Sequence, residues 1–203
     1  LGFFDEGLPE VADWEIKFLV EHGFDFQHYC WYGRYTTDPC KETSLSDAIV
    51  DGYMNAKYSD MMDMMIMWEN QSCSKTSPEF FYDYVWPYWC EWFLSDARYL
   101  RIDNKAPITL YSYSKFIENM GGMENAKKAV AFMREDIKCL GYDDIILFAC
   151  PTFTGYNEAK QKECKELGVE ALVSYTFGEL SYEAKFQKDE TMKSYNYNVL
   201  PLM

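Results

Sequence analysis

The hydrophobic positions of the chain follow two periods, one typical of helices and one typical of buried strands. Short and nearly continuous apolar runs indicate strands that are covered on both faces, as in parallel sheets. The predicted strands are residues 24–31, 62–68, 108–113, 145–149 and 171–175, and a sixth strand begins at Val199.

Amphipathic stretches separate these runs and predict helices. The first, residues 10–22, repeats Val11, Trp14, Phe18 and Leu19 at helical spacing and ends before Gly23. Further helices are predicted at residues 77–94, 124–140, 157–167 and 182–195. Another helix is predicted to start near Ser44, with the following residues on its buried face: Leu45, Ala48, Ile49, Tyr53 and Ala56.

Strict alternation of strands and helices predicts parallel strands with helical crossovers. No glycine-rich phosphate loop follows a predicted strand, which argues against a nucleotide-binding sheet. We therefore predict an α/β fold, namely a (β/α)8 TIM-type barrel that is incomplete, with about five to six β/α units. Residues 1–203 are expected to form a single domain that lacks the first strand and the seventh and eighth units.

The charge balance bears on possible partners, because 19 Lys and Arg residues stand against 33 Asp and Glu residues, a net charge of −14. An acidic surface repels phosphate backbones, so we expect no nucleic-acid partner and favour a neutral glycan over a polyanionic one. Aromatic residues make up 18% of the chain. Such residues often line sugar-binding clefts, although a tyrosine-rich core and surface is an equal alternative.

Other classes of site find little support in the sequence. No apolar run approaches the ~20 residues of a membrane span, and no targeting segment indicates a localisation. The 7 cysteines form no C-x-x-C pair, so we expect no zinc site and mostly reduced thiols. We also expect no other metal and no cofactor. A Cys30–His28 pair is geometrically possible in a strand. The oligomeric state is left open.

In a parallel barrel the active site lies at the carboxyl ends of the strands. Glu69 follows an apolar strand directly, which predicts a ligand-facing carboxylate and makes it the candidate for catalysis; the alternative is a structural ion pair. Trp31 and Trp68 are either sugar-stacking platforms or core residues, and His28 is expected in the core. The predicted substrate-binding residues are Trp31, Tyr32, Trp68, Glu69, Asn70, Tyr113 and Tyr175.

Several segments together resemble the glycoside hydrolase family 99-like proteins, also called WbsX-like proteins. Their order and spacing carry the resemblance, which extends from Glu10 to Tyr175. The matching segments are Asp13-Trp14-Glu15-Ile16-Lys17, Glu21-His22-Gly23-Phe24-Asp25-Phe26, Trp31-Tyr32, Met67-Trp68-Glu69-Asn70, Tyr99-Leu100-Arg101-Ile102-Asp103-Asn104-Lys105-Ala106-Pro107-Ile108 and Gly121-Gly122.

This resemblance implies a barrel domain truncated at both ends, from a retaining, endo-acting hydrolase of a neutral, mannose-containing glycan. The runner-up is a glycosyltransferase-like enzyme of polysaccharide biosynthesis, and a non-catalytic sugar-binding barrel is a third hypothesis. The family's two catalytic glutamates lie late in the barrel, and Glu69 corresponds to neither. Cys30 stands where the family has an aspartate. Because only Glu179 offers a second carboxylate near a strand end, we expect residues 1–203 alone not to hydrolyse glycosides.

Overall fold

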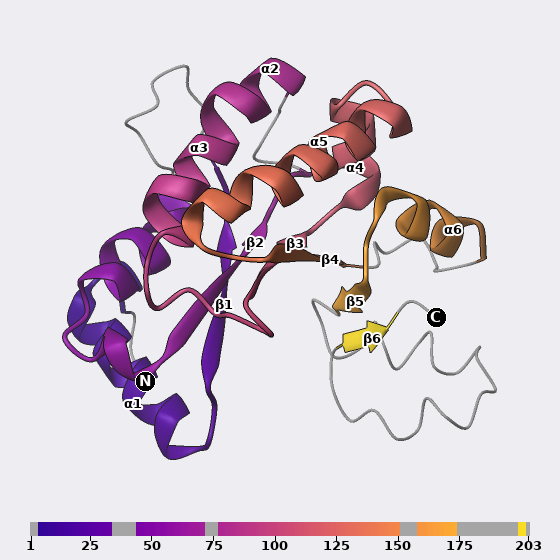
Figure 1. Cartoon of the computed structure of the whole chain (residues 1–203). Coiled ribbons are helices and arrows are strands. Elements are labelled where there is room, and N and C mark those ends of the chain that lie inside the picture. Colours follow the sequence, from indigo (N-terminus) through magenta and orange to yellow (C-terminus); the bar gives the residue numbers. More distant parts are fainter. Residues whose placement is uncertain (1–3, 34–43, 72–76, 151–157, 174–198, 202–203) are drawn as a thin grey trace, which may run out of the picture.

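The computed structural model describes residues 4–33, 44–71, 77–150, 158–173 and 199–201. It is an α/β structure in which one mixed sheet carries helices (Figure 1). The strands are β1 (Phe26–Trp31), β2 (Asp63–Trp68), β3 (Lys105–Leu110), β4 (Asp144–Ala149), β5 (Ala171–Val173) and β6 (Val199–Pro201).

The sheet follows the chain order β1-β2-β3-β4-β5-β6. Within the described residues, the first five strands are parallel, as their alternation with helices predicts. The prediction of a sixth β/α unit is wrong for β6, which pairs with β5 in antiparallel fashion, Val173 opposite Val199. An apolar run shows that a strand is present, but its direction depends on the connection before it.

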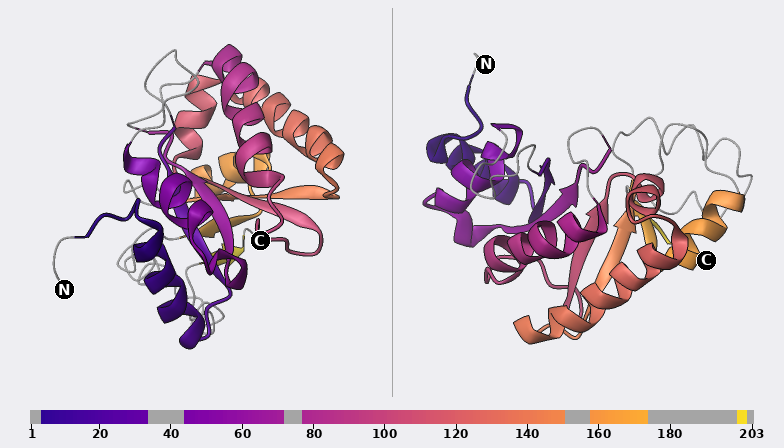
Figure 2. Two further views of the ribbon diagram at one scale, coloured as in Figure 1. Left: turned by 90° about the vertical axis from the view of Figure 1, so that its left-hand side faces the viewer. Right: turned by 90° about the horizontal axis from the view of Figure 1, so that it is seen from above.

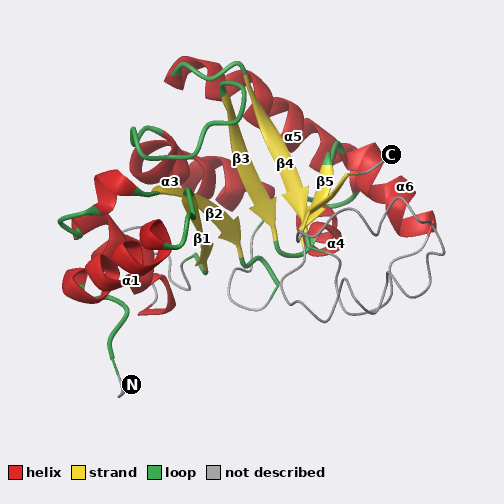
Figure 3. Ribbon diagram, turned by 90° about the horizontal axis from the view of Figure 1, so that it is seen from below, coloured by secondary structure: helices red, strands yellow, loops and turns green. Residues whose placement is uncertain are grey.

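The parallel strands curl like half of a barrel (Figure 2, right). Helices α3 (Trp86–Trp89), α4 (Tyr113–Asn119) and α5 (Met123–Asp136) lie on the convex side of this sheet. The view from below shows the arrowheads of β3 and β4 pointing the same way (Figure 3). The carboxyl ends of the strands therefore form one rim.

Helix α1 (Pro9–Glu21) confirms the first predicted helix, with Pro9 at its start, where its missing N–H costs nothing. The buried residues of α1 are Ala12 and Ile16, whereas Trp14 is 72% exposed and Phe18 is 58% exposed. The face that the spacing of Trp14 and Phe18 defines is therefore not the buried face of the helix.

Between β1 and β2 the chain forms short turns of 3₁₀ and π type rather than the one regular helix predicted from Ser44. These turns are η1 (Ser44–Ser46), η2 (Ala48–Gly52), η3 (Tyr53–Asn55) and η4 (Ser59–Met61). Ile49, Tyr53 and Ala56 are buried as predicted, but Leu45 is exposed. The Gly52 backbone approaches Glu6 so closely that a Cβ there would lie 2.4 Å from the Glu6 carbonyl oxygen, so no larger residue fits.

The predicted helix at 77–94 is present as a run of α2 (Pro78–Phe80), η5 (Phe81–Val85), α3 and η6 (Cys90–Leu94). Ser77 caps it, accepting a hydrogen bond of 3.2 Å from the Phe80 N–H. The wide π turns lie on both sides of the segment that holds Pro87, whose ring and missing N–H do not fit a regular α-helix interior.

Asp103 and Asn104 form the predicted turn, with φ angles of 48° and 58°. Ile102 and Lys105 exchange two backbone hydrogen bonds across it, as in a tight hairpin that sets the start of β3. The predicted end of this strand at Tyr113 is wrong, because β3 ends at Leu110 and Tyr113 begins α4. The Ser112 hydroxyl caps α4 by accepting from Lys115 N–H, at 3.3 Å, so a cap signal ends the extended chain.

The last described helices, α5 with its 3₁₀ extension η7 (Ile137–Leu140) and α6 (Glu158–Leu167), agree with the predicted ones. Gly141 ends the first at φ 82° and Gly168 ends the second at φ 92°, a backbone conformation that favours glycine. The predicted helix at 182–195 lies outside the described residues.

Candidate functional site

The parallel strands end in register. Trp31 pairs with Trp68, Trp68 with Leu110, Leu110 with Ala149, and Ala149 with Leu172. One residue later, the backbone continues this register through three hydrogen bonds, from Glu69 N–H to Trp31, from Tyr111 N–H to Trp68 and from Cys150 N–H to Leu110. We call Tyr32, Glu69, Tyr111 and Cys150 the rim row.

Side chains alternate between the two faces of a strand, so the rim row faces away from the helices that Trp31 and Trp68 contact. The Cys150 Sγ lies 3.4 Å from the Met67 Sδ, which places both on the concave face. Glu69 shares this face with Met67. The structure therefore positions the predicted ligand-facing carboxylate on the concave side of the sheet.

Glu69 is nearly buried, with 7% of its surface exposed. Its Oε1 accepts a hydrogen bond of 3.3 Å from the Gln71 N–H, which orients the carboxylate at the end of β2. In the described residues, Glu69 is the one carboxylate of the rim row. A single oriented carboxylate suits the binding of a hydroxyl group better than a two-carboxylate reaction.

Trp31 and Trp68 lie on the opposite, convex side. Trp31 packs on Tyr88 and Trp89 with ring centroids 5.5 and 5.7 Å apart, and Trp68 packs on Trp89 at 5.1 Å. Only 2% of Trp31 and none of Trp68 is exposed. The core alternative for both residues fits this packing, because neither ring has a face open to a ligand.

The structure also separates Asn70 and Tyr113 from the rim row. Both are buried, Asn70 by pairing its amide with the backbone of Ser112 and Tyr113 as the first residue of α4. Five of the predicted substrate-binding residues therefore do not share one face, namely Trp31, Trp68, Glu69, Asn70 and Tyr113. Tyr175 and Glu179 lie outside the described residues.

Two members of the rim row, Tyr111 and Cys150, are not among the predicted substrate-binding residues. Tyr113 was predicted instead of Tyr111. The signal of Tyr111 and Cys150 was present in the sequence, because both directly follow an apolar strand, as Glu69 does. Thr109 precedes Tyr111 by two residues and therefore lies on the same concave face. Its buried hydroxyl has no hydrogen-bond partner within the described residues. These positions depend on the register between strands, which hydrophobic patterns do not contain.

A polar cavity of about 650 Å³ borders β1 and includes Tyr32 of the rim row. Within it, the Tyr29 hydroxyl donates to Gln27 Oε1 at 2.8 Å, and Gln27 Nε2 donates to Glu15 Oε2 at 3.5 Å. Burial raises the pKa of the Glu15 carboxyl, while the bond from Gln27 opposes this shift. The cavity thus presents hydroxyl, amide and carboxyl groups together, which suits a hydroxyl-rich ligand.

His28 also lines this cavity. Burial lowers the pKa of its imidazole to about 4, against the opposing effect of a hydrogen bond with the Ile66 backbone. His28 is therefore neutral near pH 7. Its Nε2 atom is buried and has no hydrogen-bond partner within the described part of the chain.

The described part of the chain has no activated thiol at Cys90 or Cys164, no cluster of potential metal ligands and no membrane-spanning helix. Burial raises the pKa of the Cys90 and Cys164 thiols to about 12, so neither is an activated nucleophile. No group of three or more His, Cys, Asp or Glu side chains there is placed to hold a metal ion. None of the described helices combines the length and apolarity that crossing a membrane requires.

No protein-family model matches the chain, and no match was found among the curated proteins or the solved structures. The fold and the rim row therefore stand on the structure itself.

Proposed function

We propose that this chain forms much of a TIM-type (β/α)8 barrel and that the barrel binds a neutral glycan, in the setting of a glycoside hydrolase. The observation that carries the proposal is the rim row, where Glu69 lies between Tyr32 and Tyr111 at the carboxyl ends of adjacent parallel strands. Active sites of barrels of this type are built at that rim.

The chemistry of these side chains fits a sugar ring. A carboxylate accepts hydrogen bonds from sugar hydroxyl groups, and tyrosine combines a flat apolar face with a hydroxyl that donates and accepts. The polar cavity at the β1 edge of the sheet includes Tyr32 from the concave face together with Gln27 and Tyr29 from the other face. The acidic charge of the chain, −14, favours a neutral glycan over a polyanionic one.

A specific observation favours a second candidate, a non-catalytic sugar-binding barrel. Retaining hydrolysis uses two carboxyl groups about 5–5.5 Å apart. Among the described residues the rim row offers Glu69 alone, and Cys30, which pairs with Met67 on the same concave face, stands where the resemblance expects an aspartate. Glu69 in this chain is accordingly assigned to binding, whichever candidate holds for a longer protein.

Binding of α-mannan oligosaccharides, followed by titration calorimetry, tests the proposal. Glu69→Gln keeps an acceptor for the Gln71 N–H, and we expect it to weaken binding about tenfold through loss of the charged acceptor. Glu91→Gln, an exposed glutamate of η6, is the matched control and is expected to bind like the native chain. Equal affinities for all three proteins would exclude Glu69 from the site.

The same proteins are assayed for release of reducing sugar. No turnover is expected from residues 1–203. Turnover that Glu69→Gln abolishes would make Glu69 a catalytic residue. A folded chain that binds no neutral oligosaccharide at all would overturn the glycan proposal.

A further inference from the structure

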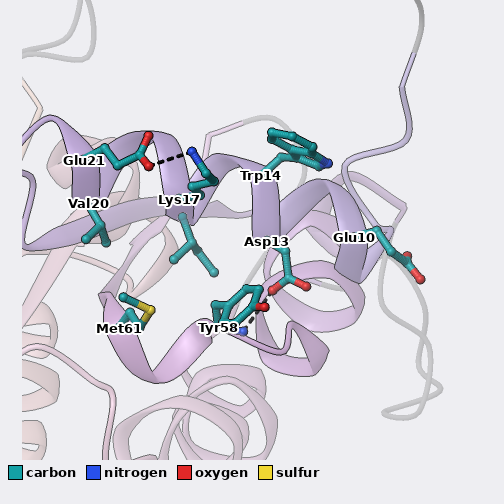
Figure 4. Close-up of a pocket in the computed structure, with 9 residues that line it drawn as sticks. Glu10, Asp13, Trp14, Lys17, Val20, Glu21, Tyr58 and Met61 are labelled. Atoms are coloured by element: carbon teal, nitrogen blue, oxygen red, sulfur yellow. Dashed lines mark hydrogen bonds and ion pairs between the residues drawn. The ribbon is translucent and has the colours of Figure 1, made fainter.

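An apolar groove of about 540 Å³ runs between α1 and η4 (Figure 4), and its lining includes no residue of the rim row. Residues of α1 at helical spacing form one wall, and Tyr58 and Met61 form the other. The residues lining the groove are Glu10, Asp13, Trp14, Ile16, Lys17, Val20, Glu21, Tyr58 and Met61.

The apolar side chains of this groove are unusually open to water. Trp14 is 72% exposed, Met61 is 60% exposed and Tyr58 is 45% exposed. Phe18, one turn after Trp14 on the same helix, is also exposed but lies outside the lining of the groove. A contiguous apolar surface with a polar border is typical of a protein-interaction site, whereas single exposed apolar residues are not.

Hydrogen bonds and an ion pair hold the shape of the groove. The Asp13 carboxylate accepts from the Tyr58 N–H at 2.9 Å, which ties α1 to the segment before η4 (Figure 4). Lys17 Nζ lies 2.6 Å from Glu21 Oε1 on the adjacent turn, so its charge is already neutralised. The groove is thus formed before any partner arrives, which lowers the entropic cost of binding.

The charge of the lining decides what kind of partner fits. Three carboxylates, on Glu10, Asp13 and Glu21, stand against the single ammonium of Lys17. A nearby ammonium, Lys57 Nζ, lies 4.9 Å from the centre of the Tyr58 ring. The net charge of the groove is therefore negative, like that of the whole chain. A second copy of the chain or an anionic membrane would bring like charge to it.

We propose that this groove is a docking site for a basic amphipathic helix, a segment of a partner protein with apolar residues on one face and Lys or Arg beside them. Grooves between helices take such segments through apolar anchors at positions i, i+3 or i+4, and i+7. Trp14, Val20 and Met61 receive the apolar face, and Glu10 and Asp13 attract the flanking cations. Helix α1, 13 residues long, provides a wall of about 20 Å.

The probe is a labelled synthetic peptide of leucine and lysine, with leucine at i, i+3, i+4 and i+7, whose binding is followed by fluorescence anisotropy. A peptide with glutamate in place of each lysine keeps the apolar face and reverses the charge. We expect the lysine peptide to bind more tightly, and increasing salt from about 0.05 M to about 0.5 M to weaken it.

Two protein variants and one control variant separate this site from general attraction to an acidic chain. Trp14→Ala is expected to weaken the lysine peptide about tenfold or more, because it removes the largest apolar anchor. Trp92→Ala is the matched control, since Trp92 is also exposed, at 47%, but lies on η6. A variant with Glu10→Gln and Asp13→Asn keeps the acceptor for Tyr58 and is expected to lose much of the salt dependence.

Each alternative outcome overturns the proposal. Equal binding by the native chain and Trp14→Ala would show attraction to net charge alone. Equal binding of the glutamate peptide would show that charge plays no part. Self-association in analytical ultracentrifugation that Trp14→Ala abolishes would assign the groove to a second copy of the chain. Circular dichroism confirms that each variant is folded.

Discussion

The side-chain amide of Asn70 forms two hydrogen bonds with the backbone of Ser112, accepting from its N–H and donating to its carbonyl, each at 2.8 Å. The amide thus acts as an extra peptide unit between the ends of β2 and β3. It holds Glu69 next to Tyr111 at the rim, because each of these residues directly adjoins one of the bonded partners.

We expect Asn70→Ala to lower the free energy of unfolding by about 2–5 kcal/mol, because two buried backbone groups lose their partners. Asn70→Asp is expected to be at least as harmful, since its carboxylate faces the Ser112 carbonyl and cannot donate. Urea denaturation monitored by circular dichroism measures both effects. A loss below about 0.5 kcal/mol for Asn70→Ala would show that water replaces the amide without cost.

Trp68 is expected to stabilise the fold and not to bind the ligand. Its ring packs on Phe81, Trp89 and Phe116, so Trp68→Ala should cost about 3–5 kcal/mol, and Trp68→Phe less. The folded Trp68→Phe protein should bind oligosaccharide with unchanged affinity. A protein that keeps its thermal stability but loses glycan binding would instead place Trp68 in the site.

The sequence predicts part of the fold and part of the candidate site. The β/α alternation predicts the five parallel strands, and the position of Glu69 directly after an apolar run predicts a rim carboxylate. The side of the sheet that Trp68 faces was not predictable in the same way. Residues 64–68 of β2 are buried on both faces, so a period of two marks the faces without telling which one meets the helices.

Other errors have a similar cause. The helical spacing of Trp14 and Phe18 is real, yet the smaller residues Ala12 and Ile16 are the buried ones, on a helix that packs against η2, η3 and η4. The backbone at Gly52 lies close to Glu6 because glycine has no side chain to separate the two segments. Tyr113 was expected in a strand because the pattern is apolar through Leu110, whereas the cap at Ser112 starts a helix.

Arg134 joins α5 to two strands. Its guanidinium lies 2.7 Å from Asp144 Oδ2 at the start of β4 and 3.0 Å from Glu170 Oε1 just before β5, and it also donates to the Gly168 carbonyl at 3.3 Å. We expect Arg134→Met to cost about 1–3 kcal/mol, because charged hydrogen bonds to several partners are lost.

The comparison for Arg134 is Lys127→Met, which breaks an exposed pair with Glu124 one turn away on the same helix. Such surface pairs contribute about 0.5 kcal/mol or less. Chemical denaturation of both variants measures the difference. Equal losses would mean that the Arg134 network adds no more than a surface ion pair.

The stability of the fold should depend on pH through His28. Burial lowers the pKa of its imidazole from 6.5 to about 4 in the folded chain. Between these pH values the unfolded chain binds a proton that the folded chain does not bind. Acid therefore favours unfolding, and the stability that neutral His28 allows above pH 6.5 is lost as the pH falls toward 4.

The loss from His28 amounts to roughly 3 kcal/mol at most across this range. Two carboxyl groups act on the pH dependence of stability in the opposite direction. Burial raises the pKa of Glu15 and Asp63, and acid stabilises a folded state with raised carboxyl pKa values.

His28→Gln removes the histidine contribution alone, so the native chain should lose more stability than this variant between about pH 7 and about pH 4.5. His22→Gln, which replaces an exposed histidine, should follow the native chain, and urea midpoints at several pH values measure all three. If the His28→Gln curve parallels the native curve, the imidazole takes up its proton in the folded state as readily as in the unfolded chain, and its burial has no effect on stability.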